Sequence, residues 1–221
     1  SFGDMPFSPR DGGVVADPTT DPVNGNPDAF AGESSTGATF RRFFACFDFK
    51  SATGIAQNGL SVTVSADNGS GGRQSFFDLE DNGSGIDVTT YDYGAGAFAG
   101  PVTIASGLSY ADWINIAVEV LFYDGAGNDV VNYYLNGSLI HTSTSWEEYY
   151  NDYQATQHPL GVPVQSLLYR VSDPVGIASV SGGGFYIDNV KTEVTDIPEP
   201  TTIALIGAGV AALAGRKKRL I

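Results

Sequence analysis

The chain has 221 residues and an acidic composition, with 25 acidic and 11 basic residues and a net charge of −14. Four of the cations lie together at 216–219, which leaves seven cations against 25 anions, a balance of −18, in the part before them. Such a surface repels phosphate groups and excludes nucleic acid as a partner. Cys46 is the only cysteine, which excludes an intramolecular disulfide.

The first segment, residues 1–37, is rich in Pro, Gly, Asp and Ser and lacks sustained hydrophobic periodicity. It predicts an irregular lead-in with one edge strand near Ala29 and Phe30.

Residues 38–195 predict one all-β domain. Hydrophobic residues recur there with a period of two in ten short segments, which Gly, Asn and Asp turns separate. No amphipathic helical stretch of useful length interrupts them, so the pattern predicts an antiparallel two-sheet sandwich. The predicted strands are Phe40–Phe49, Leu60–Ser65, Ser75–Leu79, Ile86–Thr90, Val102–Ala105, Trp113–Phe122, Val130–Leu135, Ser138–Ser143, Gln165–Val171 and Gly184–Val194.

The clearest alternation lies in the central strands and predicts the core. In Trp113–Phe122 every second residue is apolar, while Asn115 and Glu119 lie on the opposite side. Asn136 and Gly137 then favour a type I′ hairpin turn. The predicted core residues of this hairpin are Ile114, Ile116, Val118, Val120, Phe122, Val131, Tyr133 and Leu135.

Several motifs in this region resemble exported bacterial domains with a laminin-G or concanavalin A-like jelly roll. They are FYDGAGNDVV at 122–131, YLNG at 134–137, TSWEEYY at 144–150 and GFYIDNV at 184–190. The resemblance covers 38–195 and implies a jelly-roll β-sandwich. It does not select a function, because this fold serves lectins, hydrolases and adhesion modules alike.

Two groups of oxygen-bearing side chains are candidate Ca²⁺ ligands. Asp124, Asn128 and Asp129 lie in one tight glycine-rich loop, and Asp67 and Asn68 lie in another. Ca²⁺ takes six to eight oxygen ligands, more than one short loop supplies. The alternative is a pair of turns that these side chains stabilise locally.

The segment Trp146–Tyr153 is the densest group of aromatic and acidic residues in the chain. Aromatic faces beside carboxylates bind sugar rings through stacking and hydrogen bonds. The candidate carbohydrate-binding residues are Trp146, Glu148, Tyr149, Tyr150 and Tyr153. In the alternative, Trp146 closes the end of the sandwich.

We expect no enzyme activity, and the sequence assigns no catalytic residue. Asp78 and Glu80 have a spacing that places two carboxylates on one face of a strand, as glycoside hydrolysis requires. However, the signature of jelly-roll glucanases has a leading Glu where this chain has Phe76. Glycoside hydrolysis therefore stays a lesser alternative.

The last segment, residues 196–221, has three parts in a fixed order. Pro198, Glu199 and Pro200 precede an apolar run at 203–214, and Arg216, Lys217, Lys218 and Arg219 follow it. The run predicts a short single transmembrane helix whose basic end stays in the cytoplasm. This order resembles the PEP-CTERM sorting signal, which implies export, processing by an exosortase at the Pro-Glu-Pro site and removal of the tail.

Together these features predict an exported cell-surface or matrix protein of a Gram-negative-type bacterium, anchored transiently in the inner membrane. The export signal is expected upstream of Ser1 or already removed. The predicted partners are the exosortase, the membrane and an extracellular polysaccharide bound by the sandwich. The alternative is a structural surface or filament subunit that binds no sugar.

Overall fold

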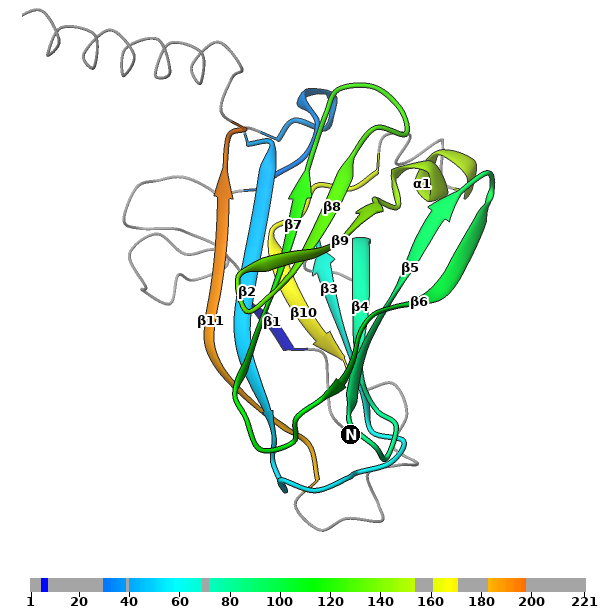
Figure 1. Ribbon diagram of the computed structural model, residues 1–221. Coiled ribbons are helices and arrows are strands. Elements are labelled where there is room, and N and C mark those ends of the chain that lie inside the picture. The colour runs from blue at the N-terminus through cyan, green and yellow to red at the C-terminus, as the bar shows by residue number, and fades with distance from the viewer. Residues whose placement is uncertain are drawn as a thin grey trace, which may run out of the picture.

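The computed structural model describes residues 30–38, 40–68, 72–153, 161–170 and 183–197, together with the backbone of 5–7. Two antiparallel sheets pack face to face (Figure 1). One has the strand order β1-β10-β3-β4-β5-β6 and the other β11-β2-β7-β8-β9. The strands are β1 (Met5–Phe7), β2 (Arg42–Ser51), β3 (Ser61–Asp67), β4 (Arg73–Asp81), β5 (Ile86–Gly94), β6 (Ala97–Leu108), β7 (Ile114–Leu121), β8 (Val130–Leu135), β9 (Ser138–Thr144), β10 (Ser166–Arg170) and β11 (Phe185–Thr195).

The predicted fold class, an antiparallel two-sheet jelly-roll sandwich, is confirmed, and each predicted strand has a counterpart. Two differences lie within it, and β1 in the lead-in was also not predicted. A seven-residue helix, α1 (Glu147–Tyr153), follows β9, and β6 is far longer than the predicted Val102–Ala105. In the lead-in, Ala31 forms isolated bridges with Phe40 and Val164, followed by the single turn η2 (Ser34–Thr36).

The core lies between the sheets and follows the predicted alternation. In β2 buried and half-buried residues alternate without exception, which places Phe43, Phe47 and Phe49 inside. The ring of Phe47 stacks on Phe77 of β4 with centroids 6.2 Å apart, which joins the two sheets. Each such buried side chain contributes about 1.5–3 kcal/mol.

The residues predicted inside the central hairpin are buried, apart from the half-buried Leu135. At its turn, Asn136 and Gly137 both have positive φ, 48° and 80°, as the type I′ prediction requires. Ala31 also belongs to the core, so part of the predicted lead-in packs into the sandwich.

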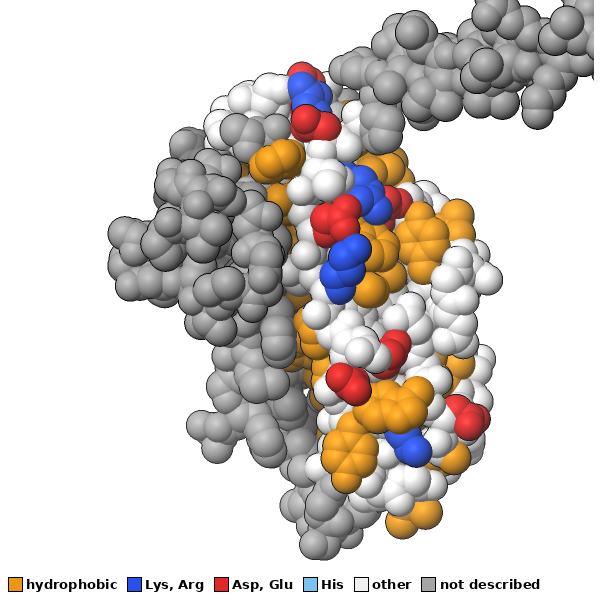
Figure 2. Space-filling view, turned by 90° about the vertical axis from the view of Figure 1, so that its left-hand side faces the viewer, with side chains coloured by type: hydrophobic (Ala, Val, Ile, Leu, Met, Phe, Trp, Pro, Cys, Tyr) orange, Lys and Arg blue, Asp and Glu red, His pale blue; other side chains and the backbone are white. Residues whose placement is uncertain are grey.

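Paired charges cover the outer face of the five-stranded sheet near its β11 edge. Arg42 of β2 contacts Glu119 of β7 at 2.6 Å and Glu193 of β11 at 3.5 Å, and Lys191 contacts Glu193 at 2.7 Å. Figure 2 shows this side of the molecule, with basic and acidic side chains next to one another. In this part of the face, two cations therefore balance two carboxylates.

Within the described ranges no helix has the length and apolar character needed to span a membrane. The predicted transmembrane segment at 203–214 and the sorting residues Pro198–Pro200 and 216–219 lie outside those ranges.

Candidate functional site

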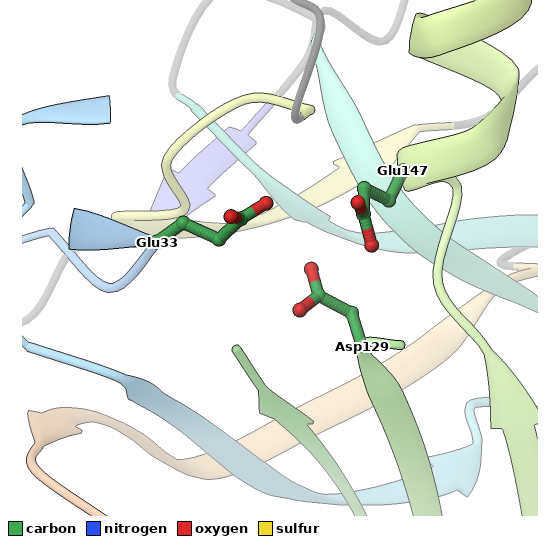
Figure 3. Close-up of side chains that lie close together, drawn as sticks. All are labelled: Glu33, Asp129 and Glu147. Carbon is green, nitrogen blue, oxygen red and sulfur yellow. The ribbon is translucent and has the colours of Figure 1, made fainter. Parts of the chain in front are cut away.

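Three carboxylates from distant parts of the chain meet at one end of the sandwich. Glu33 precedes η2, Asp129 precedes β8, and Glu147 is the first residue of α1. One carboxylate oxygen from each lies within 4.8 Å of the other two, and Figure 3 shows the three groups pointing toward one another. Their exposed fractions are 1%, 4% and 1%, so the group is buried. We call these residues the carboxylate cluster.

The loop between β7 and β8, residues 122–129, holds the carboxylate cluster in place with its backbone amides. Tyr123 N donates to Asp129 Oδ1 at 2.8 Å, Gly125 N to Glu33 Oε2 at 3.1 Å, and Asn128 N to Glu147 Oε2 at 3.3 Å. Gly125 and Gly127 adopt positive φ in this loop, which lets the amides turn inward. Each carboxylate thus has one oxygen fixed by the same loop.

The second oxygen of each carboxylate has no such bond. Glu33 Oε1, Asp129 Oδ2 and Glu147 Oε1 are buried and have no hydrogen-bond partner in the described part of the chain. No ion pair among those residues includes any of the three. A buried acceptor without a partner is unfavourable by about 1–3 kcal/mol, and more when charged.

Burial raises the pKa of Asp129 to about 8, and the carboxylates of Glu147 and Glu33 add to the rise. Burial also raises the pKa of Glu33 and that of Glu147, although loop amides oppose this. The carboxylate cluster therefore resists holding three negative charges by itself. Its charge can be balanced by protons or by a bound cation.

Of the predicted Ca²⁺ ligands, only Asp129 belongs to the carboxylate cluster. Asp124 turns outward, accepts from Ser34 N at 3.1 Å and pairs with Arg41 at 2.9 Å. The Asn128 side-chain amide donates to Asp124 O at 3.0 Å. The carboxylate of Asp124 is therefore bound by Ser34 and Arg41, and Asp129 is the acidic residue of this loop that belongs to the cluster.

The second predicted group does not join the cluster either. Asp67 is buried at the end of β3, where its carbonyl accepts from Gln165 N and Ser166 Oγ. Asn68 Oδ1 accepts a hydrogen bond from Gly72 N at 3.0 Å. Asn68 thus stabilises its own turn, as the alternative to Ca²⁺ binding predicts.

Two of the predicted sugar-binding residues are buried. Trp146 is 9% and Tyr150 4% exposed, and both belong to a small cluster with Tyr93 and Val162. Trp146 Nε1 donates to Tyr91 O at 3.3 Å, and Tyr150 Oη donates to a backbone carbonyl at 3.1 Å. Their faces are not open to a ligand, which agrees with the alternative in which Trp146 closes the sandwich end.

The remaining aromatic residues of the segment form an exposed surface with a residue that the sequence did not indicate. Tyr153 is 65% exposed, Tyr149 is half-buried, and their rings lie 5.2 Å apart. Phe98 of β6 is 43% exposed and lies 5.3 Å from Tyr149 and 4.7 Å from Trp146. We call Phe98, Tyr149 and Tyr153 the aromatic platform. The predicted Glu148 is half-buried, and its carboxylate lies near Gly94 and Gly127.

Asp78 and Glu80 alternate with the buried Phe77 and Leu79 on β4, which places both on the outer face of the six-stranded sheet. Thr63 Oγ1 donates to Asp78 at 2.5 Å. Burial raises the pKa of Asp78, and burial together with the nearby Asp78 raises the pKa of Glu80. This is a pair of carboxyls whose protons are held more tightly than usual.

The comparisons with known proteins concern two parts of the chain, the C-terminal segment and the β-sandwich. A family model described as the PEP-CTERM protein-sorting motif matches residues 196–219. A search of curated proteins gave no match. Among solved structures, the chain is similar to CG-16, a homodimeric agglutinin from chicken liver, at 11% identity and a TM-score of 0.42, covering 86% of this chain and 100% of that one.

Two other similar structures are a carbohydrate-binding module and a lyase. The first is CBM66 from Bacillus subtilis, at 11% identity and a TM-score of 0.39, covering 69% of this chain and 75% of that one. The second is a family 7 alginate lyase, at 13% identity and a TM-score of 0.44, covering 79% and 68%. The chain thus joins a two-sheet antiparallel sandwich to a PEP-CTERM motif, which indicates exosortase-sorted export to the cell surface.

Proposed function

We propose that this protein is displayed at the cell surface or in the extracellular matrix, where its sandwich binds a polysaccharide through the aromatic platform. The observation that supports this most directly is the exposure of Phe98 and Tyr153 on a base of packed rings. Exposed aromatic faces that are fixed before binding stack on the C–H faces of sugars with little loss of conformational entropy.

The base of the aromatic platform favours a fixed geometry. Buried Trp146 contacts both Phe98 and Tyr149, at 4.7 and 5.8 Å between centroids. Tyr93 Oη donates to Asp152 at 2.7 Å, which ties the end of α1 to β5. The exposed Asn151 and Asp152 lie on the same helix and offer polar groups for sugar hydroxyls.

The route to the surface follows from the sorting motif. In this proposal an exosortase-type membrane protease recognises Pro198, Glu199 and Pro200 while the apolar run holds the chain in the inner membrane of a Gram-negative-type bacterium. The basic residues Arg216–Arg219 remain on the cytoplasmic side. Cleavage then releases the acidic sandwich outside.

The test of sugar binding is a glycan array followed by affinity measurements on the full chain. Replacing both Phe98 and Tyr153 with alanine should weaken binding about tenfold or more, because each stacked ring contributes about 0.5–1.5 kcal/mol. Tyr186→Ala is the matched control, since Tyr186 is a 56% exposed tyrosine on β11. No binding to any polysaccharide, or an equal loss in the control, contradicts the proposal. Self-association without sugar would favour the structural subunit.

The raised pKa values of Asp78 and Glu80 favour a second candidate, glycoside hydrolysis, in which one of them stays protonated as a general acid. The test incubates wild-type chain and the variants Asp78→Asn and Glu80→Gln with a panel of β-glucans. Release of sugar that both variants abolish supports hydrolysis. No release by the wild type rejects it.

A further inference from the structure

We propose that the carboxylate cluster is a Ca²⁺ site. This inference is independent of sugar binding and concerns three residues, of which the sequence indicated only Asp129. It depends on two separate observations: the convergence of three buried carboxylates, and the unpaired second oxygen that each retains.

The oxygens are close enough together for one ion to bind all three. The cluster atoms lie within 4.8 Å of one another, and two ligands on opposite sides of Ca²⁺, with bonds of about 2.4 Å, lie about 4.8 Å apart. Mg²⁺ gives up its water reluctantly and is seldom held by protein oxygens alone, which favours Ca²⁺ for a buried group of carboxylates. The donors are all carboxylate oxygens, with no His or Cys in the group, which favours a hard cation over Zn²⁺.

A bound cation would also balance the charge of the cluster. Arg41 is the cation whose charge acts on Glu33, but it forms its ion pair with Asp124. Taking three carboxylates out of water without a counter-charge is strongly unfavourable, and a divalent ion offsets most of their charge at once. The oxygens that lack a hydrogen-bond partner would then serve as ligands.

A bound ion would join three segments that are far apart in sequence. Glu33 belongs to the segment before β2, Asp129 ends the loop between β7 and β8, and Glu147 begins α1 (Figures 1 and 3). The loop whose amides hold the carboxylates is itself exposed at residues 123–128. Ca²⁺ would therefore stabilise this end of the sandwich.

The experiment titrates the full chain, freed of metal by chelation, with Tb³⁺ and reads luminescence excited through the aromatic residues. Trp146 precedes Glu147 and Tyr123 donates its amide to Asp129, so energy donors lie beside the site. We expect the luminescence to saturate as Tb³⁺ binds, and Ca²⁺ to displace the bound Tb³⁺ far better than Mg²⁺ does. The Kd for Ca²⁺ should be on the order of 10⁻⁴ to 10⁻³ M, as in other extracellular sites. At about 100 times Kd, Ca²⁺ should raise Tm by about 5–10 °C.

Variants assign the signal to these residues. Glu147→Gln and Asp129→Asn should each weaken Ca²⁺ binding at least tenfold and abolish the Tm shift. In chelator their Tm should equal or exceed that of the wild type, because one buried charge is gone. Glu148→Gln, which removes the same charge from the next residue, should keep the Tm shift.

Three results would overturn the site. The first is that the wild type shows no Tm shift up to about 10 mM Ca²⁺, which is well above the expected range of Kd. The second is that Glu148→Gln loses as much Ca²⁺ binding as the cluster variants. The third is that Glu147→Gln binds Ca²⁺ as well as the wild type does. If Asp129→Asn does not fold, Glu33→Gln replaces it, and the wild-type titration decides whether an ion binds at all.

Discussion

Replacing Trp146 with alanine should unfold the protein far more easily, because the structure makes this residue part of the interior. The side chain is 9% exposed, and its ring lies 4.7, 5.1 and 5.8 Å from the rings of Phe98, Phe76 and Tyr149. Removing a buried tryptophan lowers the free energy of unfolding by about 3–5 kcal/mol. About 1 kcal/mol of this is the indole hydrogen bond to Tyr91 O.

Urea unfolding followed by far-UV circular dichroism measures this loss. Tryptophan fluorescence is unsuitable, because the substitution leaves Trp113 as the only tryptophan and the signal would then come from a different residue. Trp146→Phe keeps most of the packing and should lose only about 1–2 kcal/mol. Tyr153→Ala, at a 65% exposed position of the same segment, should lose less than about 1 kcal/mol. If Trp146→Ala loses no more than Tyr153→Ala, Trp146 is not buried and the case for it as a sugar contact returns.

Two further predictions concern the sheets. Burial alone would raise the pKa of Glu119, but hydrogen bonds from Arg42, Asn132 and Tyr134 outweigh it and lower the pKa below 4.5. The ionised Glu119 therefore stabilises the fold above pH 4.5, and this stabilisation is lost as pH falls through the folded-state pKa. Between about pH 6 and about pH 3, the Tm of Glu119→Gln should fall less than the Tm of the wild type. Parallel curves of Tm against pH would refute this. At Gly85 a Cβ would lie 2.6 Å from the Gly107 Cα, so Gly85→Ala should lose more than about 2 kcal/mol in urea unfolding. Gly94→Ala, with its nearest atom at 4.0 Å, should stay within about 0.5 kcal/mol, and equal losses would contradict the close approach.

The strands could be predicted from sequence because burial on one face imposes a period of two. Trp113–Phe122 shows the pattern clearly and β7 lies within it. The long β6 was underestimated because its residues are exposed or half-buried throughout, so no apolar face marks it. The helix α1 was missed because seven residues make two turns, too few for a helical period to appear.

The carboxylate cluster could not be predicted because its members share no sequence neighbourhood. The hydrogen bond between Gly125 N and Glu33 spans 92 residues, and Glu33 lies in a segment whose composition indicated only an irregular lead-in. Asp124 was selected for its closeness to Asp129, but Arg41 and Ser34 take its carboxylate. Local spacing identifies turns well, whereas tertiary pairing decides which acidic groups are left without a partner.

The two proposed sites share α1, so we expect binding at one site to affect binding at the other. Glu147 at its start belongs to the carboxylate cluster, while Tyr149 and Tyr153 belong to the aromatic platform. A helix of seven residues is not stable by itself, so its position depends on the contacts at both sites. If Ca²⁺ fixes the start of α1, it should tighten polysaccharide binding, and by linkage the polysaccharide should tighten Ca²⁺ binding by the same factor. Equal sugar affinities in chelator and in saturating Ca²⁺ would mean that Trp146 and Tyr150 alone hold the helix in place.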